Sequence, residues 1–120
     1  MKIRATIVCE QNHQVLLVRK PKKPWNLPGG RLKSGETCAA AAVRELNEET
    51  GLSSDSLLYL MEWTSEGTKH HVFEVSVSNV DDAAPRNEIC DCLWQPLDSI
   101  QNIEICKAAL LILKSFQRRL

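Results

Sequence analysis

The chain has 120 residues, enough for one compact domain, which we expect to span residues 1–120. Hydrophobic residues make up 43% of the chain and charged residues 25%, proportions that exclude an intrinsically disordered protein. The net charge is zero and no apolar run is long enough to span a bilayer, so neither a nucleic-acid partner nor a membrane is expected.

The first 35 residues are predicted to form a β-hairpin followed by a shaped loop. Apolar residues alternate with polar ones at Ile3, Ala5 and Ile7, residues 10–13 have the composition of a turn, and residues 15–18 form an apolar run. Residues 21–35 contain three prolines and three glycines, too many breakers for a helix. We therefore expect two antiparallel strands and then an irregular segment.

Residues 37–50 are predicted to form a helix, with Thr37 as its N-cap and Gly51 following its last turn. At about 100° per residue, an apolar stripe and an acidic arc lie side by side on this helix. The stripe consists of Ala39, Ala42, Val43, Leu46 and Thr50, and the arc consists of Glu45, Glu48 and Glu49. Cys38 and Ala41 continue the acidic arc, and their small size is expected to leave space for a ligand.

The second half of the chain is predicted to contain three strands and a C-terminal helix. Residues 57–63 and 71–77 have strand composition and are joined by a turn around Gly67, residues 79–87 resemble a surface loop, and residues 93–96 resemble a short strand. Apolar residues at helical spacing then predict a helix near residues 104–119, packed on the sheet. The apolar residues with this spacing are Ile105, Ala109, Ile112, Phe116 and Leu120.

The acidic arc has two interpretations. Like charges three or four positions apart on a helix repel each other by roughly a few tenths of a kcal/mol per pair, and a bound divalent cation would remove this repulsion. A solvated acidic face is the commoner arrangement on a surface helix. The helix by itself leaves both interpretations open.

The residues around this helix also follow a fixed pattern. From Gly30 to Leu52 the sequence reads Gly-x5-Glu-x7-Arg-Glu-Leu-x-Glu-Glu-x-Gly-Leu, preceded by Trp-Asn-Leu-Pro-Gly. This pattern resembles the box of the Nudix hydrolase family at every defined position, and the order of the predicted elements is also similar to that family. The resemblance implies an α/β (α+β) fold, a Nudix-like α/β/α sandwich with a mixed central β-sheet.

The resemblance implies a metal site and a set of supporting residues. It implies that the carboxylates of the acidic arc and the carbonyl of Gly29 bind Mg²⁺ or Mn²⁺, and that one of these glutamates, or a glutamate outside the box, activates the attacking water. Arg44 would orient a carboxylate of the box, and Gly30 and Gly51 would permit the geometry of the adjoining loops. Glu36 would support the box or the metals from the start of the helix.

Several residues outside the box are candidates for substrate binding. Arg19 and Lys20 end the second predicted strand, where they could contact phosphate or be solvated. Glu88 lies where many Nudix proteins place a further functional glutamate, and an exposed loop carboxylate is the alternative. Trp25 could stack on a base, although packing against the core is favoured. His70 and His71 should point to opposite faces of a strand.

The leading hypothesis is a pyrophosphohydrolase that cleaves the diphosphate linkage of a nucleoside diphosphate linked to another group, such as an NTP or dNTP. The alternative is a non-catalytic module of the same fold that binds or senses a nucleotide. Isoprenoid diphosphate isomerisation and messenger-RNA decapping have less support in the sequence. The resemblance also allows a homodimer.

The cysteines and the N-terminus favour a cytoplasmic protein. The five cysteines are odd in number and lack C-x-x-C spacing, so we expect reduced thiols rather than disulfides or a zinc site. No charged segment followed by an apolar run and a cleavage site is present at the start of the chain.

Overall fold

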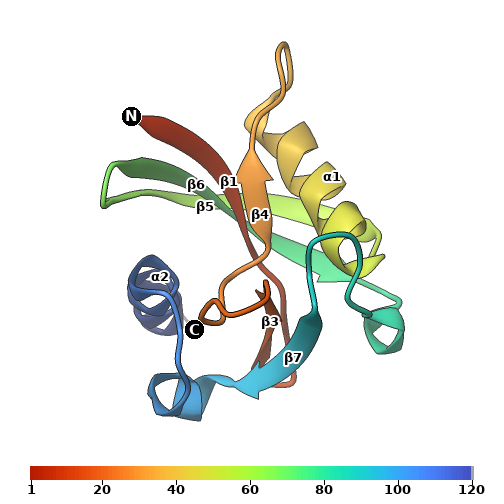
Figure 1. The fold of residues 1–120 in the computed structure, drawn as a ribbon, viewed down its shortest axis with the longest axis vertical. Helices are drawn as coiled ribbons and strands as arrows, with labels where there is room; N and C mark the ends of the chain where they lie inside the picture. The colour runs from red at the N-terminus through yellow and green to blue at the C-terminus, as the bar shows by residue number, and fades with distance from the viewer. Residues whose placement is uncertain (120) are drawn as a thin grey trace.

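The computed structural model describes residues 1–119 and contains two β-sheets and two α-helices (Figure 1). The larger sheet has the strand order β4-β1-β6-β5, and β1 runs parallel to β6 while the other pairs are antiparallel. These strands are β1 (Lys2–Val8), β4 (Gly29–Arg31), β5 (Ser54–Ser65) and β6 (Thr68–Val77). The smaller, antiparallel sheet consists of β2 (Glu10–Gln11), β3 (Gln14–Arg19) and β7 (Asp91–Pro96).

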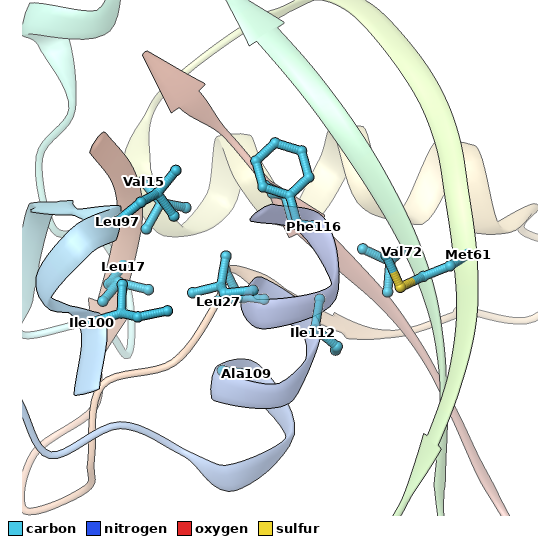
Figure 2. Close-up of a cluster of buried hydrophobic side chains, with 12 residues drawn as sticks. Val15, Leu17, Leu27, Met61, Val72, Leu97, Ile100, Ala109, Ile112 and Phe116 are labelled. Carbon is cyan, nitrogen blue, oxygen red and sulfur yellow. The ribbon is translucent and has the colours of Figure 1, made fainter. Parts of the chain in front are cut away.

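Each helix is associated with its own hydrophobic core. The helix α1 (Cys38–Thr50) packs through Ala42 and Leu46 into a cluster that includes Ile7 of β1 and Phe73 of β6. The helix α2 (Lys107–Gln117) packs into a second cluster with Val8. Figure 2 shows this second cluster, in which the labelled side chains are Val15, Leu17, Leu27, Met61, Val72, Leu97, Ile100, Ala109, Ile112 and Phe116. Because neighbouring residues of a strand face opposite sides, β1 contributes to both cores.

The predicted hairpin at the N-terminus is only partly correct. A short hairpin does form between β2 and β3, and its turn places Asn12 and His13 at positive φ. However, β1 and β3 do not pair, because β1 is already bonded to β4 on one edge and to β6 on the other, and β3 pairs with β7. The chain therefore changes sheets at Cys9.

The segment predicted as an irregular loop contains a strand. Its last part forms β4, which pairs with β1 in the register Arg4 to Arg31, Ala5 to Gly30 and Thr6 to Gly29. Glycine-rich composition concealed this strand, because glycines are depleted in strands and mark places of close backbone approach. The strands predicted at 57–63, 71–77 and 93–96 are confirmed, each with longer bounds, as β5, β6 and β7.

The predicted helix over residues 37–50 is confirmed. The Thr37 side chain accepts the N–H of Ala40 at 3.1 Å, and Gly51 ends the helix with a φ of 77°. The prediction for its faces was partly wrong, because Ala41 is fully buried and Cys38 packs against the same core, whereas Val43 is exposed. Cys38 and Ala41 therefore make room for the sheet and not for a ligand.

The C-terminal helix begins later than predicted. Residues 97–102 form a 3-10 helix (Leu97–Asn102), and Ile105 lies in an extended segment that bridges to Trp25. A shorter 3-10 helix (Val80–Asp82) interrupts the predicted surface loop. Leu120, which the helical spacing included, lies outside the described residues. None of the helices within residues 1–119 has the length and apolar character needed to cross a membrane.

Candidate active site

Arg44 binds three carboxylates beside the N-terminal half of α1. Its Nε and Nη2 donate to the two carboxylate oxygens of Glu36 at 2.7 and 2.9 Å, and its Nη1 donates to Glu45 at 2.7 Å and to Glu48 at 3.1 Å. The hydrogen bonds from Arg44 and from the Lys33 backbone N–H lower the pKa of Glu36 to about 2. The hydrogen bonds to Glu36 and Glu45 raise the pKa of Arg44. Arg44 and Glu36 are therefore both charged. Arg44 also donates to the backbone carbonyl of Arg31, and so it connects the segment before α1 to the end of β4.

Glu49 differs from these three carboxylates because it has no ion pair within residues 1–119. Its Oε1 accepts the backbone N–H of Gly29 at 3.0 Å, which joins the end of α1 to the start of β4. Burial is the main cause that raises the pKa of Glu49 to about 7; the charge of Glu45 acts in the same direction, and the Gly29 hydrogen bond opposes it. This carboxyl group is thus poised to exchange a proton near neutral pH.

Two adjoining cavities open on this part of the molecule. The larger, of about 450 Å³, has a charged lining of Lys2, Arg4, Lys20, Gly29, Gly30, Arg31, Glu45, Glu49, Thr68 and Glu88. The smaller, of about 260 Å³, has a mainly apolar lining of Arg4, Val18, Lys20, Lys23, Pro24, Asn26, Leu27, Gly29, Glu49, Ile89 and Cys106. Arg4, Lys20, Gly29 and Glu49 belong to both, so the two cavities meet at these residues.

Backbone hydrogen bonds fix the loops that line the cavities. The loop after the 3-10 helix (Val80–Asp82) is tied to the end of α1, since the N–H of Arg86 donates to the Glu49 carbonyl at 3.0 Å. This contact brings Glu88 and Ile89 to the cavities. On the opposite side, Trp25 exchanges backbone hydrogen bonds of 2.8 Å with the residues on either side of Ile105, and this pairing places Cys106 against the loop before β4.

The structure brings most of the predicted site residues together, but not all of them. Gly29, Gly30, Glu45, Glu49 and Glu88 line the larger cavity, and Glu88 also forms an ion pair of 3.4 Å with Lys20. The metal and catalytic roles assigned to these residues from the resemblance stay predictions.

The four other predicted residues, Arg19, Glu36, Arg44 and Glu48, do not line either cavity. Glu36 is engaged by Arg44, and Glu48 lies between Arg44 and the more distant Lys33. Arg19 pairs with Asp91 at 3.4 Å and stacks over the ring of Trp25, with 4.4 Å from its guanidinium carbon to the ring centre. Trp25 therefore packs against Arg19 and the core, and Lys20 is the residue of that strand end that reaches the cavities.

Sequence reasoning missed Arg4, Asn26, Ile89 and Cys106. Arg4 and Asn26 carry a weak signal, because each is a polar residue within an otherwise apolar or buried segment. Ile89 and Cys106 carry none, since they come from two distant loops that only the tertiary structure brings together.

The chemistry of the larger cavity fits a hard divalent cation. Within residues 1–119 no three Asp, Glu, His or Cys side chains converge as they stand to enclose an ion. Yet the lining offers the carboxylate oxygens that Mg²⁺ and Mn²⁺ prefer, and these come from Glu45, Glu49 and Glu88. A cation beside Glu45 and Glu49 would also offset the unfavourable interaction that their two charges have with each other.

Gly30 provides the space that the Glu45 carboxylate occupies. A Cβ atom at this position would lie 2.6 Å from the Glu45 carboxyl carbon and 2.7 to 2.8 Å from its oxygens. Glycine thus allows a carboxylate to lie directly on the backbone of β4, beside Gly29. This close approach places Glu45 at the edge of the cavity where a cation would be held.

Comparison with known proteins is consistent with this geometry. A family model for the NUDIX domain matches residues 2–115. An 8-oxo-(d)GTP phosphatase of Mycolicibacterium smegmatis is 33% identical over 90 residues, which cover 72% of this chain and 28% of that protein. An 8-oxo-dGTP diphosphatase of Proteus vulgaris is 35% identical over 57 residues, which cover 43% of this chain and 51% of that protein.

A solved structure extends the similarity over the whole fold. A protein from Chromobacterium violaceum that is assigned to the nudix hydrolase family aligns with a TM-score of 0.86 and 29% identity, over 98% of this chain and 77% of that one. This chain spans no more than a third of the length of the first curated relatives that it matches.

Proposed function

Because this chain belongs to the NUDIX domain family, we propose that it is a metal-dependent diphosphatase that cleaves a phosphoanhydride bond of a nucleotide by attack of water at phosphorus. The observation that carries this proposal is the meeting of an apolar cavity and a carboxylate-lined cavity at Gly29 and Glu49. A nucleoside triphosphate has the same division into an organic group and a chain of phosphates. We take it as the leading substrate class.

The smaller cavity suits the organic part of the substrate. Pro24, Leu27 and Ile89 offer apolar surface, and ligand sites commonly combine such surface with a few polar groups. Asn26 supplies one of them, because its Oδ1 accepts the N–H of Leu27 at 2.9 Å and its amide N–H groups can donate to a ligand. The volume of about 260 Å³ suits a base better than a whole nucleotide.

The larger cavity suits the phosphates and the cations bound to them. Glu45, Glu49 and Glu88, with the Gly29 carbonyl that the family resemblance implies, would hold the metal. Bound Mg²⁺ or Mn²⁺ supplies charge stabilisation for the phosphate oxygens and lowers the pKa of a coordinated water. Lys20 and Arg31 face the same space and can neutralise further phosphate charge.

Arg44 and Glu49 have separate roles in the reaction. Arg44 holds Glu45 in place over Gly30 through a hydrogen bond of 2.7 Å. Glu49 is held through Oε1 by Gly29, which leaves Oε2 to accept the proton of the attacking water. The water oxygen forms a bond to phosphorus, the bridging P–O bond breaks, and the products are two phosphate-containing molecules.

Turnover on a substrate panel tests this proposal. The panel contains nucleoside triphosphates including 8-oxo-dGTP, nucleotide sugars, ADP-ribose and dinucleotides, with Mg²⁺ or Mn²⁺ and phosphate detection after a coupling enzyme. We expect Glu48→Gln and Glu49→Gln each to lower turnover more than about tenfold. Glu49→Gln removes a carboxylate of the larger cavity, and Glu48→Gln removes a carboxylate to which the family resemblance assigns metal binding. Glu62→Gln, a glutamate of β5 away from both cavities, is the matched control.

The outcomes separate an enzyme from a binding module. Full turnover in both box variants would contradict the proposed mechanism. No turnover on the entire panel, together with nucleotide binding measured by calorimetry, would favour the non-catalytic alternative.

A further inference from the structure

Arg4 is an incompletely bonded arginine at the centre of the site. Its Nε donates to the Thr6 hydroxyl at 3.2 Å and its Nη2 donates to the Leu27 carbonyl at 2.7 Å. A guanidinium has five N–H groups, so three of them have no hydrogen-bond acceptor within residues 1–119. The side chain is partly buried, and burial lowers the pKa of Arg4. Because Nε and Nη2 are bonded to the protein, the Nη1 group is left free for a ligand in the cavities that Arg4 lines.

The charge of Arg4 is also without a direct partner. Among residues 1–119, no carboxylate lies within 4.0 Å of its guanidinium, and Glu49 and Glu45 act on it only at longer range. Moreover, Arg31 lies directly opposite Arg4 in the β1–β4 register, an arrangement that is destabilising for like charges. An anion bound between β1, β4 and α1 would pair with the charge of Arg4 and would reduce the repulsion between Arg4 and Arg31.

Thr6 and His70 hold the guanidinium in a fixed orientation. The Thr6 hydroxyl accepts from Arg4 and lies 2.8 Å from Nδ1 of His70 on the neighbouring strand. Burial, together with the charge of Arg4, lowers the pKa of His70 to about 4, so this imidazole is neutral at physiological pH. A neutral Nδ1 can accept the Thr6 proton, which leaves the hydroxyl oxygen directed to Arg4.

The position of Arg4 identifies the anion. Arg4 belongs to both cavities, so a substrate with its organic group in the apolar cavity and its phosphates beside the carboxylates must pass over it. The first phosphate after the organic group reaches this junction. Arginine is suited to such a phosphate, because its planar guanidinium can donate two parallel hydrogen bonds.

We propose that Arg4 binds the phosphate that is attached directly to the organic group of the substrate, through the N–H groups that the protein leaves free. This inference rests on the proposed function and assigns one task within it. Hydrolysis of any phosphoanhydride bond leaves that phosphate on the organic product, so Arg4 is a binding residue for a nucleoside monophosphate as well as for the substrate. Thr6 is its positioning residue.

The test uses the full chain without metal. Adenosine, guanosine, cytidine and uridine 5′-monophosphates are titrated separately while the arginine Nε–H signals are followed by NMR, with the four nucleosides and inorganic pyrophosphate as comparison ligands. We expect at least one monophosphate to shift the Arg4 signal, and its nucleoside to leave that signal in place. If none of the four monophosphates moves the Arg4 signal in the wild-type protein, the proposal is wrong.

Substitutions give a second, independent measurement. We expect Arg4→Met to weaken monophosphate binding at least tenfold and to change nucleoside binding less than twofold. Arg119→Met is the matched control, since Arg119 also donates to a backbone carbonyl, that of Leu60, but lies outside both cavities. If Arg4→Met does not fold, Arg4→Lys replaces it with an expected loss of at least threefold, because an ammonium group lacks the paired geometry. Unchanged monophosphate binding in a folded variant overturns the proposal.

The turnover measurements and the Arg4 measurements can fail independently, so the two proposals are tested separately. Turnover on the nucleotide panel with a stationary Arg4 signal would leave the diphosphatase standing and remove this role of Arg4. A shifted Arg4 signal without turnover on any substrate would retain the phosphate site and assign it to a binding module.

Discussion

Two arginines lie close to the glutamates of α1 and are used in different ways. Arg44, on α1, donates to three carboxylates and a backbone carbonyl, so its charge is paired directly with groups of the protein. Arg4, on β1, contacts a hydroxyl and a carbonyl and has no carboxylate partner among the described residues. The first arginine organises the protein's own acidic groups, whereas the second is placed to meet an acidic ligand.

This difference divides the site into two parts. In the balanced part every charged group has a direct ion-pair partner, and in the unbalanced part no charged group has one among residues 1–119. The balanced part comprises Arg44 with Glu36, Glu45 and Glu48. The unbalanced part comprises Arg4 and Glu49, which both lie where the two cavities meet. We expect the balanced part to contribute to folding stability and the unbalanced part to change with pH and with ligands.

The largest expected effect concerns Glu49 in the metal-free protein. Its pKa is raised from 4.5 to about 7, so the folded state holds this proton more tightly than the unfolded state. The resulting stabilisation is present below about pH 4.5 and is lost as the pH rises through about 7, by about 3 kcal/mol in total. Urea unfolding at pH 5 and pH 8 should show this loss in the wild type and not in Glu49→Gln.

His70 makes the comparison between variants necessary. Its lowered pKa has the opposite effect, since stability falls as the pH drops from 6.5 towards about 4. The difference between wild type and Glu49→Gln cancels this contribution. Parallel pH dependences in the two proteins would show that Glu49 is ionised throughout, and Glu49 would then belong to the balanced part.

The next largest effect is expected from Arg44→Met. This substitution leaves Glu36, Glu45 and Glu48 close together without their shared counter-charge, and removing one partner of such a network is strongly destabilising. We expect Tm to fall by about 8 °C without metal. Thermal unfolding followed by circular dichroism measures this change, and addition of Mg²⁺ should restore part of it. An unchanged Tm would mean that the three carboxylates do not depend on Arg44.

The smallest effect on stability is expected from Arg4→Met. The variant loses two hydrogen bonds, but it also removes a buried charge that has no direct partner, and these two changes oppose each other. We expect Tm to change by less than about 4 °C in either direction. A fall as large as that of Arg44→Met would remove the distinction between the two arginines.

The sequence could predict the balanced part because its residues are local. Glu36, Arg44, Glu45 and Glu48 lie on or just before one helix, and helical periodicity together with the box pattern places them side by side. Capping by Thr37 and Gly51 is equally local and was predicted correctly. The error at Ala41 arose because the sequence does not say how wide a face of the helix the sheet covers.

Of the unbalanced part, the sequence predicted Glu49, which lies on the helix of the box, but not Arg4, whose position depends on strand pairing. Arg4 reaches the site only because β1 lies between β4 and β6, and β4 was hidden in a segment rich in proline and glycine. The sequence also did not distinguish Arg19 from Lys20 as the residue that reaches the cavities. Neighbouring residues of a strand differ in the face they occupy, and the sequence alone did not determine which of them turns towards the cavities.

The short pairing between β1 and β4 has a consequence for how this protein can change. Only three residue pairs join the strands, and they set the positions of Arg4, Gly29 and Gly30. A one-residue insertion within β4 would turn each following side chain to the other face and dismantle the site. The preceding loop, with Lys23, Pro24 and Asn26, lies outside this pairing and lines only the smaller cavity. Insertions there can alter which organic group is accepted while the phosphate-binding framework is inherited unchanged.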